Sequence, residues 1–200
     1  MNEEQVWILQ AQRGDDDAFT NLVETYQRPV YNLCYRMLGE PEYAEDAAQE
    51  TFLRAYQHIG RYDINRPFAT WLLSIAAHYC IDRLRRHRLP TFSMDAETDE
   101  GYEIEIPDAA APNPEAEAAR SEQREQIHQL VQSLDATDRA AIVLRYWYDF
   151  SEVEIAESLS LTVPAVKSRL HRARRALAKK WEDSSAQTGM ERMPYETPAF

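Results

Sequence analysis

The sequence predicts an all-α protein of two helical domains, and three observations support that prediction. Residues that favour helices (Ala, Leu, Glu, Arg and Gln) dominate the chain, whereas only 5 of its 200 residues are Gly. Apolar residues recur at spacings of three and four along most of its length. A stretch rich in acids and prolines interrupts that periodicity. We therefore expect helical domains at 5–90 and 121–182, an acidic flexible linker at 91–120 and a disordered tail at 183–200.

The outward face of one predicted helix in the first domain carries an unexpected leucine. An apolar stripe runs from Phe19 to Met37, with a bend expected before Pro29, and the next helix is expected over residues 42–59. The outward residues of this second helix are acids and amides, except for Leu53. A single exposed leucine is ordinary on a solvated surface, which remains one interpretation. Because carboxylates flank it, Leu53 otherwise indicates a docking site for a basic partner with an apolar centre.

Residues 61–68 form a polar loop with aromatic residues near both ends, and a helix with a basic end follows it. The helix that follows carries Trp71 and ends in an arginine-rich cluster at residues 82–88. Exposed rings stack on unpaired bases and arginines hold phosphates, so this segment indicates binding of single-stranded nucleic acid. The alternative is that Phe68 and Trp71 belong to the core and that the arginines only favour a helix C-terminus. We expect Trp71 to be largely buried under either interpretation.

Residues 151–180 show the pattern of a helix-turn-helix. Ser151 and Glu154 form a capping box before a short helix, and Thr162 caps a second helix with Pro164 in its first turn. The stretch from Thr162 to Lys180 holds seven Lys or Arg and no acid, which indicates an anionic partner such as DNA phosphate. A solvated basic helix on a bundle is the alternative. The expected packed face consists of Val166, Leu170, Ala173 and Leu177, and the expected outer face includes Ser168, His171, Arg172 and Arg175.

The charge of the chain is strongly asymmetric. The net charge is -12, and residues 95–125 hold eleven acids against Arg120 and Arg124. The remainder of the chain is therefore close to neutral, with its basic residues gathered in two clusters. This balance does not exclude DNA binding, but it suggests that free DNA binds weakly and that another component brings the protein to DNA.

Several classes of protein are disfavoured. There is no apolar run near 18 residues, so no membrane insertion is expected, and the acidic N-terminus lacks the features of a signal peptide. Cys34 and Cys80 lie 46 positions apart with no CxxC pair, so we expect reduced core residues of a cytoplasmic protein, with no metal and no cofactor. The five His show no HExxH spacing, and no Walker-type loop or GxSxG motif is present, so no enzymatic activity is expected.

Three segments in this order resemble one known family. They are AEDAAQETFLRAYQHIGRYD, RPFATWLLSIAAHYCIDRLRRHR and DATDRAAIVLRYWYDFSEVEIAESLSLTVPAVKSRLHRARRAL. The chain resembles a bacterial RNA polymerase sigma factor of the extracytoplasmic-function (ECF) group over residues 10–182. The resemblance implies that 5–90 is sigma region 2, which binds core polymerase and the −10 element, and that 121–182 is sigma region 4, a helix-turn-helix for the −35 element.

The resemblance also implies a role for three groups of residues. For docking on core RNA polymerase it implies Asp46, Gln49, Glu50 and Leu53. For the −10 element it implies Arg61, Asn65, Arg66, Phe68, His78, Asp82, Arg83, Arg85 and Arg86. For the −35 duplex it implies Lys167, Ser168, Arg169, His171, Arg172 and Arg175. His78 stands where relatives often have Asn, and His171 stands at a variable place, so no base preference is inferred.

The partners that the resemblance implies are core RNA polymerase, promoter DNA and an anti-sigma factor that covers the same surfaces in the free state. The alternative function is a stand-alone helix-turn-helix transcriptional regulator, with the first domain as a sensor or dimerisation module. The two functions differ in a measurable way. A regulator should bind duplex DNA alone, whereas a sigma factor should need core polymerase.

Overall fold

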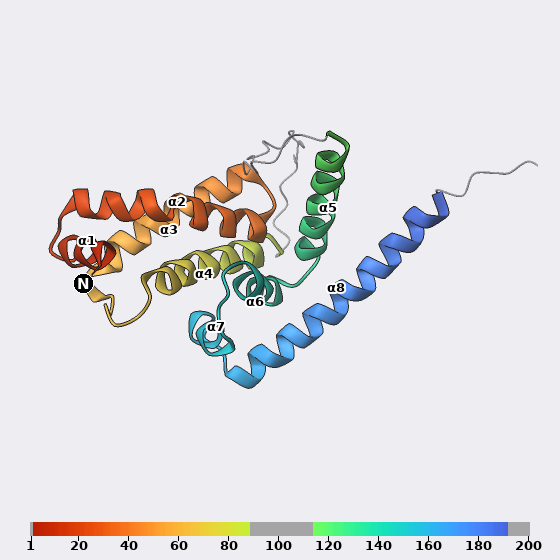
Figure 1. Cartoon of the computed structure of the whole chain (residues 1–200). Coiled ribbons are helices and arrows are strands. Elements are labelled where there is room, and N and C mark those ends of the chain that lie inside the picture. The colour runs from red at the N-terminus through yellow and green to blue at the C-terminus, as the bar shows by residue number, and fades with distance from the viewer. Residues whose placement is uncertain (1, 89–113, 192–200) are drawn as a thin grey trace, which may run out of the picture.

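The computed structural model describes residues 2–88 and 114–191, and the regular structure within these ranges is entirely helical (Figure 1). The all-α prediction is therefore confirmed over the described residues. The first domain consists of α1 (Glu3–Ala11), α2 (Asp16–Leu38), α3 (Pro41–His58), the 3-10 turn η1 (Ile59–Arg61) and α4 (Phe68–Arg88). The second consists of α5 (Pro114–Gln132), α6 (Ala136–Trp147), α7 (Glu152–Ser158) and α8 (Val163–Glu191).

Capping residues define the long helices of the first domain. Asp15 accepts a hydrogen bond from the backbone N–H of Ala18 at 3.0 Å and begins α2, which continues through Pro29 as one helix. It ends at Gly39, whose φ of 90° lies in the left-handed region that glycine adopts without a steric cost. Pro41 then begins α3, where the missing N–H costs nothing.

Helix α2 forms the centre of the first domain and packs against α1, α3 and α4. The residues of its predicted apolar stripe that are fully buried include Leu33, Cys34 and Met37. On α3, the alanines expected to face inward are buried or half-buried. Tyr56, which was also expected to face inward, is 45% exposed instead, because its hydroxyl donates to Asp16 Oδ1 at 2.6 Å on the rim of the domain.

Two helices extend past the predicted boundaries. Helix α5 begins at Pro114, so residues 114–120, expected to belong to the flexible linker, are helical. Helix α8 continues to Glu191, so residues 183–191, expected to be disordered, are helical as well. Once a helix is nucleated, each further residue adds a hydrogen bond, so α8 can extend without an apolar stripe. The remainder of both predictions, residues 89–113 and 192–200, lies outside the described residues.

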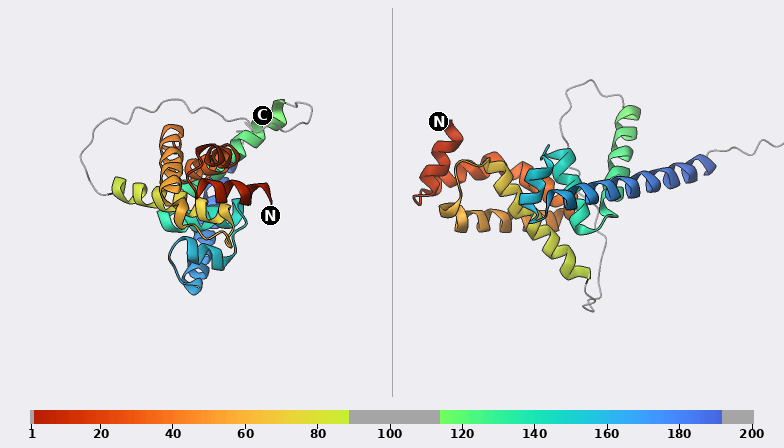
Figure 2. Two further views of the ribbon diagram at one scale, coloured as in Figure 1. Left: turned by 90° about the vertical axis from the view of Figure 1, so that its left-hand side faces the viewer. Right: turned by 90° about the horizontal axis from the view of Figure 1, so that it is seen from below.

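The two domains pack against each other in this structure. Helix α6 lies against α2 and α4, α7 against α4, and α5 against α2. The Tyr148 hydroxyl donates to Pro29 O at 2.7 Å, and the His128 ring stacks on Tyr35 with 4.8 Å between centroids. Arg139 of α6 donates to Met37 O near the C-terminus of α2. Figure 2 shows α8 extending away from this packed body, at the end opposite to the N-terminus.

Candidate polymerase and nucleic-acid interfaces

The outward face of α3 presents an apolar residue within a polar surround. Leu53 is 53% exposed, and Asp46 and Gln49 beside it are also exposed. The half-buried Glu50 accepts from Arg54 Nε at 2.7 Å, one turn further along the helix. Asp46 lies 3.7 Å from a guanidinium nitrogen of Arg83 on α4. The four residues predicted to dock on polymerase therefore share one face, with Leu53 as its apolar centre.

The loop between η1 and α4 is supported by a cluster of aromatic rings. Phe68 contacts Tyr26, Tyr62 and Trp71 with centroid distances of 5.3, 5.4 and 5.5 Å. Phe68 is only 3% exposed, so its ring cannot stack on a base in this conformation. Its prediction as a DNA-contacting residue is therefore corrected, because the apolar interior of the domain takes up the ring. Trp71 is half-buried and packs on the core, close to expectation.

The tip of this loop is ordered by its own polar groups. Asp63 Oδ1 accepts from the backbone N–H of Asn65 at 3.0 Å and from its side-chain amide at 2.9 Å, and these bonds lower the pKa of Asp63. Tyr62 donates to Arg66 O, and burial raises the pKa of its phenol to about 12. Three predicted residues are exposed here: Arg61 at the end of η1, and Asn65 and Arg66 on the loop.

Beyond Phe68, the predicted residues of α4 are exposed except for Arg83, and both Arg83 and Arg85 contact neighbouring helices. His78, Asp82 and Arg86 are exposed, with His78 Nδ1 3.0 Å from Ser74 O and Arg86 Nε 3.3 Å from Asp82 O. Arg83 is largely covered and stacks over the Tyr43 ring at 4.4 Å, while Arg85 donates to Thr137 Oγ1 of α6 at 3.2 Å. In this structure Arg83 therefore packs against α3, whereas Arg85 stays exposed and bonds α6 through one nitrogen.

The helix-turn-helix begins with the predicted capping box. Ser151 Oγ accepts from the backbone N–H of Glu154 at 3.2 Å, and Glu154 Oε2 accepts from the backbone N–H of Ser151 at 2.8 Å. Thr162 Oγ1 in turn accepts from the N–H of Ala165 at 3.3 Å and caps α8. These bonds fix the residues at which α7 and α8 begin, and therefore help to set the angle between the two helices.

Replacing Ser151 with Ala is expected to destabilise the chain by about 1 kcal/mol, the usual cost of losing an N-cap, as measured by urea denaturation at pH 7. The hydrogen bond from the Ser151 N–H lowers the pKa of Glu154 from its ordinary 4.5. The carboxylate therefore contributes to the free energy of unfolding above pH 4.5, and this contribution is lost as the pH falls through the folded-state pKa. Ser168→Ala is the matched control, since Ser168 is exposed in mid-helix. An equal loss in both variants would contradict the capping assignment.

Helix α8 separates a buried face from a basic outer face, as the periodicity predicts. Val166, Leu170 and Ala173 are buried, and the outer residues that are exposed are Lys167, Ser168, His171, Arg172 and Arg175.

Asp138 of α6 organises part of this outer face, a role that sequence reasoning missed. Arg169 lies 2.5 Å from Asp138 Oδ1 and is largely covered, so it positions the helix more than it offers a free cation. Arg172, by contrast, is 62% exposed and lies 4.0 Å from the same carboxylate. No local pattern marks Asp138, because the pair joins residues 31 positions apart.

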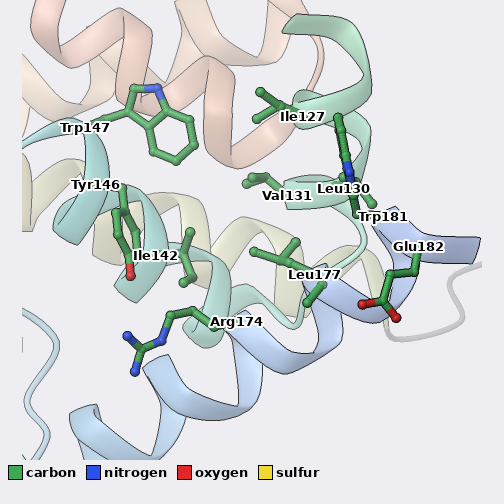
Figure 3. Close-up of a pocket in the computed structure, with 11 residues that line it drawn as sticks. Ile127, Leu130, Val131, Ile142, Tyr146, Trp147, Arg174, Leu177, Trp181 and Glu182 are labelled. Carbon is green, nitrogen blue, oxygen red and sulfur yellow. The ribbon is translucent and has the colours of Figure 1, made fainter. Parts of the chain in front are cut away.

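An apolar pocket on the packed side of α8 was also missed. It has a volume of about 430 Å³ and lies between α5, α6 and α8 (Figure 3). Trp181 is the residue from which the sequence could have indicated this pocket. It follows Leu177 by four residues and extends the apolar stripe of α8 by one turn.

Two kinds of feature are absent from residues 2–88 and 114–191. None of the helices there combines the length and apolarity needed to cross a membrane. Over the same ranges, no three His, Cys, Asp or Glu residues gather in a way that could hold a metal ion.

Family models match both domains of the chain. Sigma-70 region 2 matches residues 22–89, and Sigma-70 region 4 matches residues 124–177. The exposed faces of α3, α4 and α8 described above lie within these two ranges. A stand-alone helix-turn-helix regulator is not favoured, because the first domain has its own match to a sigma region.

Similarity to individual proteins extends over most of the chain. It is 42% identical over 181 residues to the ECF RNA polymerase sigma factor SigW of Bacillus subtilis, covering 88% of this chain and 95% of that protein. It is 34% identical over 179 residues to the RNA polymerase sigma-H factor of Pseudomonas aeruginosa, covering 88% of this chain and 93% of that protein. Among solved structures it is similar to CnrH in complex with the cytosolic domain of CnrY, with 27% identity, a TM-score of 0.64 and coverage of 91% and 99%. The chain therefore belongs to the ECF sigma factors, which direct RNA polymerase to promoters and initiate transcription there.

Proposed function

We propose that three exposed surfaces divide the work of this sigma factor. The α3 face centred on Leu53 docks on core RNA polymerase, the loop 61–66 with the exposed part of α4 holds −10 DNA, and the outer face of α8 recognises the −35 duplex. The observation that carries the proposal is the arrangement of α8, whose exposed basic face lies opposite the buried side chains of Val166, Leu170 and Ala173. A helix held in this way can enter a major groove without exposing its apolar side.

At the −35 element, the exposed residues of α8 supply both kinds of contact that DNA recognition needs. Arg172 is long and exposed enough to read a base edge, where a bidentate contact to guanine provides about 1–3 kcal/mol of discrimination. Lys167 and Arg175 neutralise phosphates, and Lys167 must first release Glu152, which lies 3.5 Å away. Arg169 supports the helix through Asp138.

At the −10 element, the ordered loop provides a frame for an unpaired base. Extracting a base from the duplex costs a few kcal/mol, which contacts to the extracted base and polymerase binding must offset. Asn65 and Arg66 offer exposed amide and guanidinium donors at the loop tip. Phe68 supports the loop from below, since its ring is buried.

The two domains must separate when both promoter elements are bound. Arg66 of the −10 loop lies 3.5 Å from Glu157 of α7, so the loop and the helix-turn-helix are in contact in this structure. The −35 and −10 elements are about two helical turns apart, roughly 70 Å. Residues 89–113 can reach roughly 80 Å when fully extended, so the chain permits this separation.

The remaining partners and properties follow from this mechanism. Binding energy performs the function, so this chain needs no catalytic residue or cofactor, and it works where polymerase and DNA are, in the cytoplasm. CnrH was solved in complex with the cytosolic domain of CnrY. By analogy, an anti-sigma factor binds this chain and covers the same surfaces when the chain is not bound to polymerase.

Run-off transcription with purified core RNA polymerase tests the proposal. The chain should create discrete starts that share −35 and −10 elements, and Arg172→Ala should reduce them by roughly 5- to 150-fold, corresponding to about 1–3 kcal/mol. Lys179→Ala, on an exposed part of the same helix, is the matched control. If Arg172→Ala reduces transcription equally from promoters with a scrambled −35 element, Arg172 contacts phosphate and does not read a base. Duplex binding by the chain alone, with no new starts, would contradict the proposed mechanism.

A further inference from the structure

Asp138 lies at the boundary between α6 and the basic outer face of α8. It belongs to the first turn of α6, where the N-terminus of a helix favours a negative charge. Its side chain is 16% exposed, and Oδ1 lies 2.5 Å from Arg169 Nη1 and 4.0 Å from Arg172 Nη2. A single carboxylate therefore contacts two of the arginines on the face proposed to meet the −35 duplex.

This contact does not depend on how the two domains are arranged. Asp138, Arg169 and Arg172 all belong to the second domain, in which α6 packs against α8. The Asp138–Arg169 pair is largely covered, whereas the side chains of the Lys167–Glu152 pair are 63% and 39% exposed. Salt therefore screens the Asp138 pair less, and the pair is retained when the domains separate on a promoter.

We propose that Asp138 is a positioning residue that determines specificity at the −35 element, because it keeps Arg169 away from DNA phosphate and restricts the position of Arg172. This inference rests on the −35 function proposed above for α8. Affinity for any duplex grows with the number of phosphates that the protein neutralises, so each free cation on this face raises non-specific binding. Asp138 neutralises one such cation, Arg169, inside the domain.

The contact with Arg172 acts on specific binding in the opposite direction. The Arg172 side chain is 62% exposed and has many rotamers available, including ones that would reach a phosphate instead of a base. A carboxylate 4.0 Å away attracts the guanidinium and limits these rotamers, so less conformational freedom is lost when Arg172 contacts a base. Asp138 thus lowers non-specific binding and favours specific binding, which together raise the specificity ratio.

Asp138→Asn tests the first half of this inference through the salt dependence of binding. Asparagine has the same shape and still offers Arg169 an acceptor oxygen, but it lacks the charge. Holoenzyme formed from core RNA polymerase and the variant is titrated with a random-sequence duplex. Release of Arg169 to a phosphate should steepen the slope of log K against log salt by about 0.9, or roughly 3.5-fold in affinity between about 50 and 200 mM salt. Adding Arg169→Gln should return the slope to that of the unaltered chain.

Asp149→Asn is the matched control, since it removes the same charge from the same domain. Asp149 is exposed on the turn after α6, and its φ of 55° is one that asparagine also adopts. Its slope should equal that of the unaltered chain, and so should the slope of Asp138→Glu, which keeps the charge at the α6 position. An equal steepening in Asp149→Asn would attribute the effect to net charge and overturn the inference.

Selection from duplexes with a randomised −35 segment tests the second half. Arg172→Ala identifies the base pair whose preference depends on Arg172, and Asp138→Asn should weaken that same preference by at least about 5-fold. A uniform loss of binding with the preference unchanged would show that the pair only joins α6 to α8, and would overturn the inference. If holoenzyme with the unaltered chain selects no −35 sequence, the proposed function of α8 fails instead, and the specificity role of Asp138 fails with it.

Discussion

Leu53→Asp is expected to abolish stable binding to core RNA polymerase while leaving the fold intact. Leu53 is 53% exposed, so the substitution removes no core contact and should change the free energy of unfolding by less than about 0.5 kcal/mol. At the docking face, the same change places a charge at the apolar centre and adds to the neighbouring acids. Loss of a central contact residue of this kind costs at least about 2 kcal/mol, or roughly 30-fold in Kd. A pull-down or titration with core polymerase measures it.

The matched control is Val153→Asp. Val153 is 54% exposed on α7, so it has nearly the same exposure and the same apolar-to-acid change, on a surface not assigned to polymerase. It should bind core polymerase normally. If Leu53→Asp binds equally well, the α3 face is not the docking site, and Leu53 is an ordinary solvated leucine. Circular dichroism and urea denaturation of both variants separate a loss of binding from a loss of folding.

The parts of the structure that sequence reasoning predicted are those specified by local patterns. The capping box of Ser151 and Glu154 and the stripe from Val166 to Leu177 depend on residues three and four positions apart, which a helix brings together whatever the rest of the chain does. The exposed position of Leu53 follows from the same periodicity. The exposed basic face of α8 was predictable for this reason.

The features that were missed are of two kinds. In some, the local sequence is compatible with two structures, and in others the contacting residues lie far apart in the sequence. Pro114 was assigned to the linker, although a proline suits the first turn of a helix, and the helix-forming run that follows it completes α5. Phe68 could have been a stacking platform or a core residue, and only the positions of Tyr26 and Trp71 decide for the core. The pairing of Asp138 with Arg169 and the pocket beside α8 require the helices to be placed in space first.

Arg139 is the clearest example of a residue whose role exists only in three dimensions. It is 5% exposed, and its guanidinium donates to Met37 O of the first domain and to Gln132 O and Leu134 O of the second. These carbonyls lie at or just beyond the C-termini of α2 and α5, where a helix leaves acceptors unsatisfied and its dipole favours a cation. A single side chain thus satisfies two helix ends and joins the two domains.

Arg139→Met is therefore expected to lower the free energy of unfolding by about 3 kcal/mol, because it keeps the side-chain volume but leaves buried carbonyls unsatisfied. The domains should also open, which small-angle scattering would detect as a larger radius of gyration. Tyr148→Phe is the control: it removes only the bond from the hydroxyl to Pro29 O and should cost about 1 kcal/mol. If Arg139→Met costs no more than Tyr148→Phe and the scattering is unchanged, Arg139 does not hold the domains together. If the predicted loss is found, the closed arrangement depends on hydrogen bonds to helix ends, which polymerase binding energy could break without disturbing either domain core.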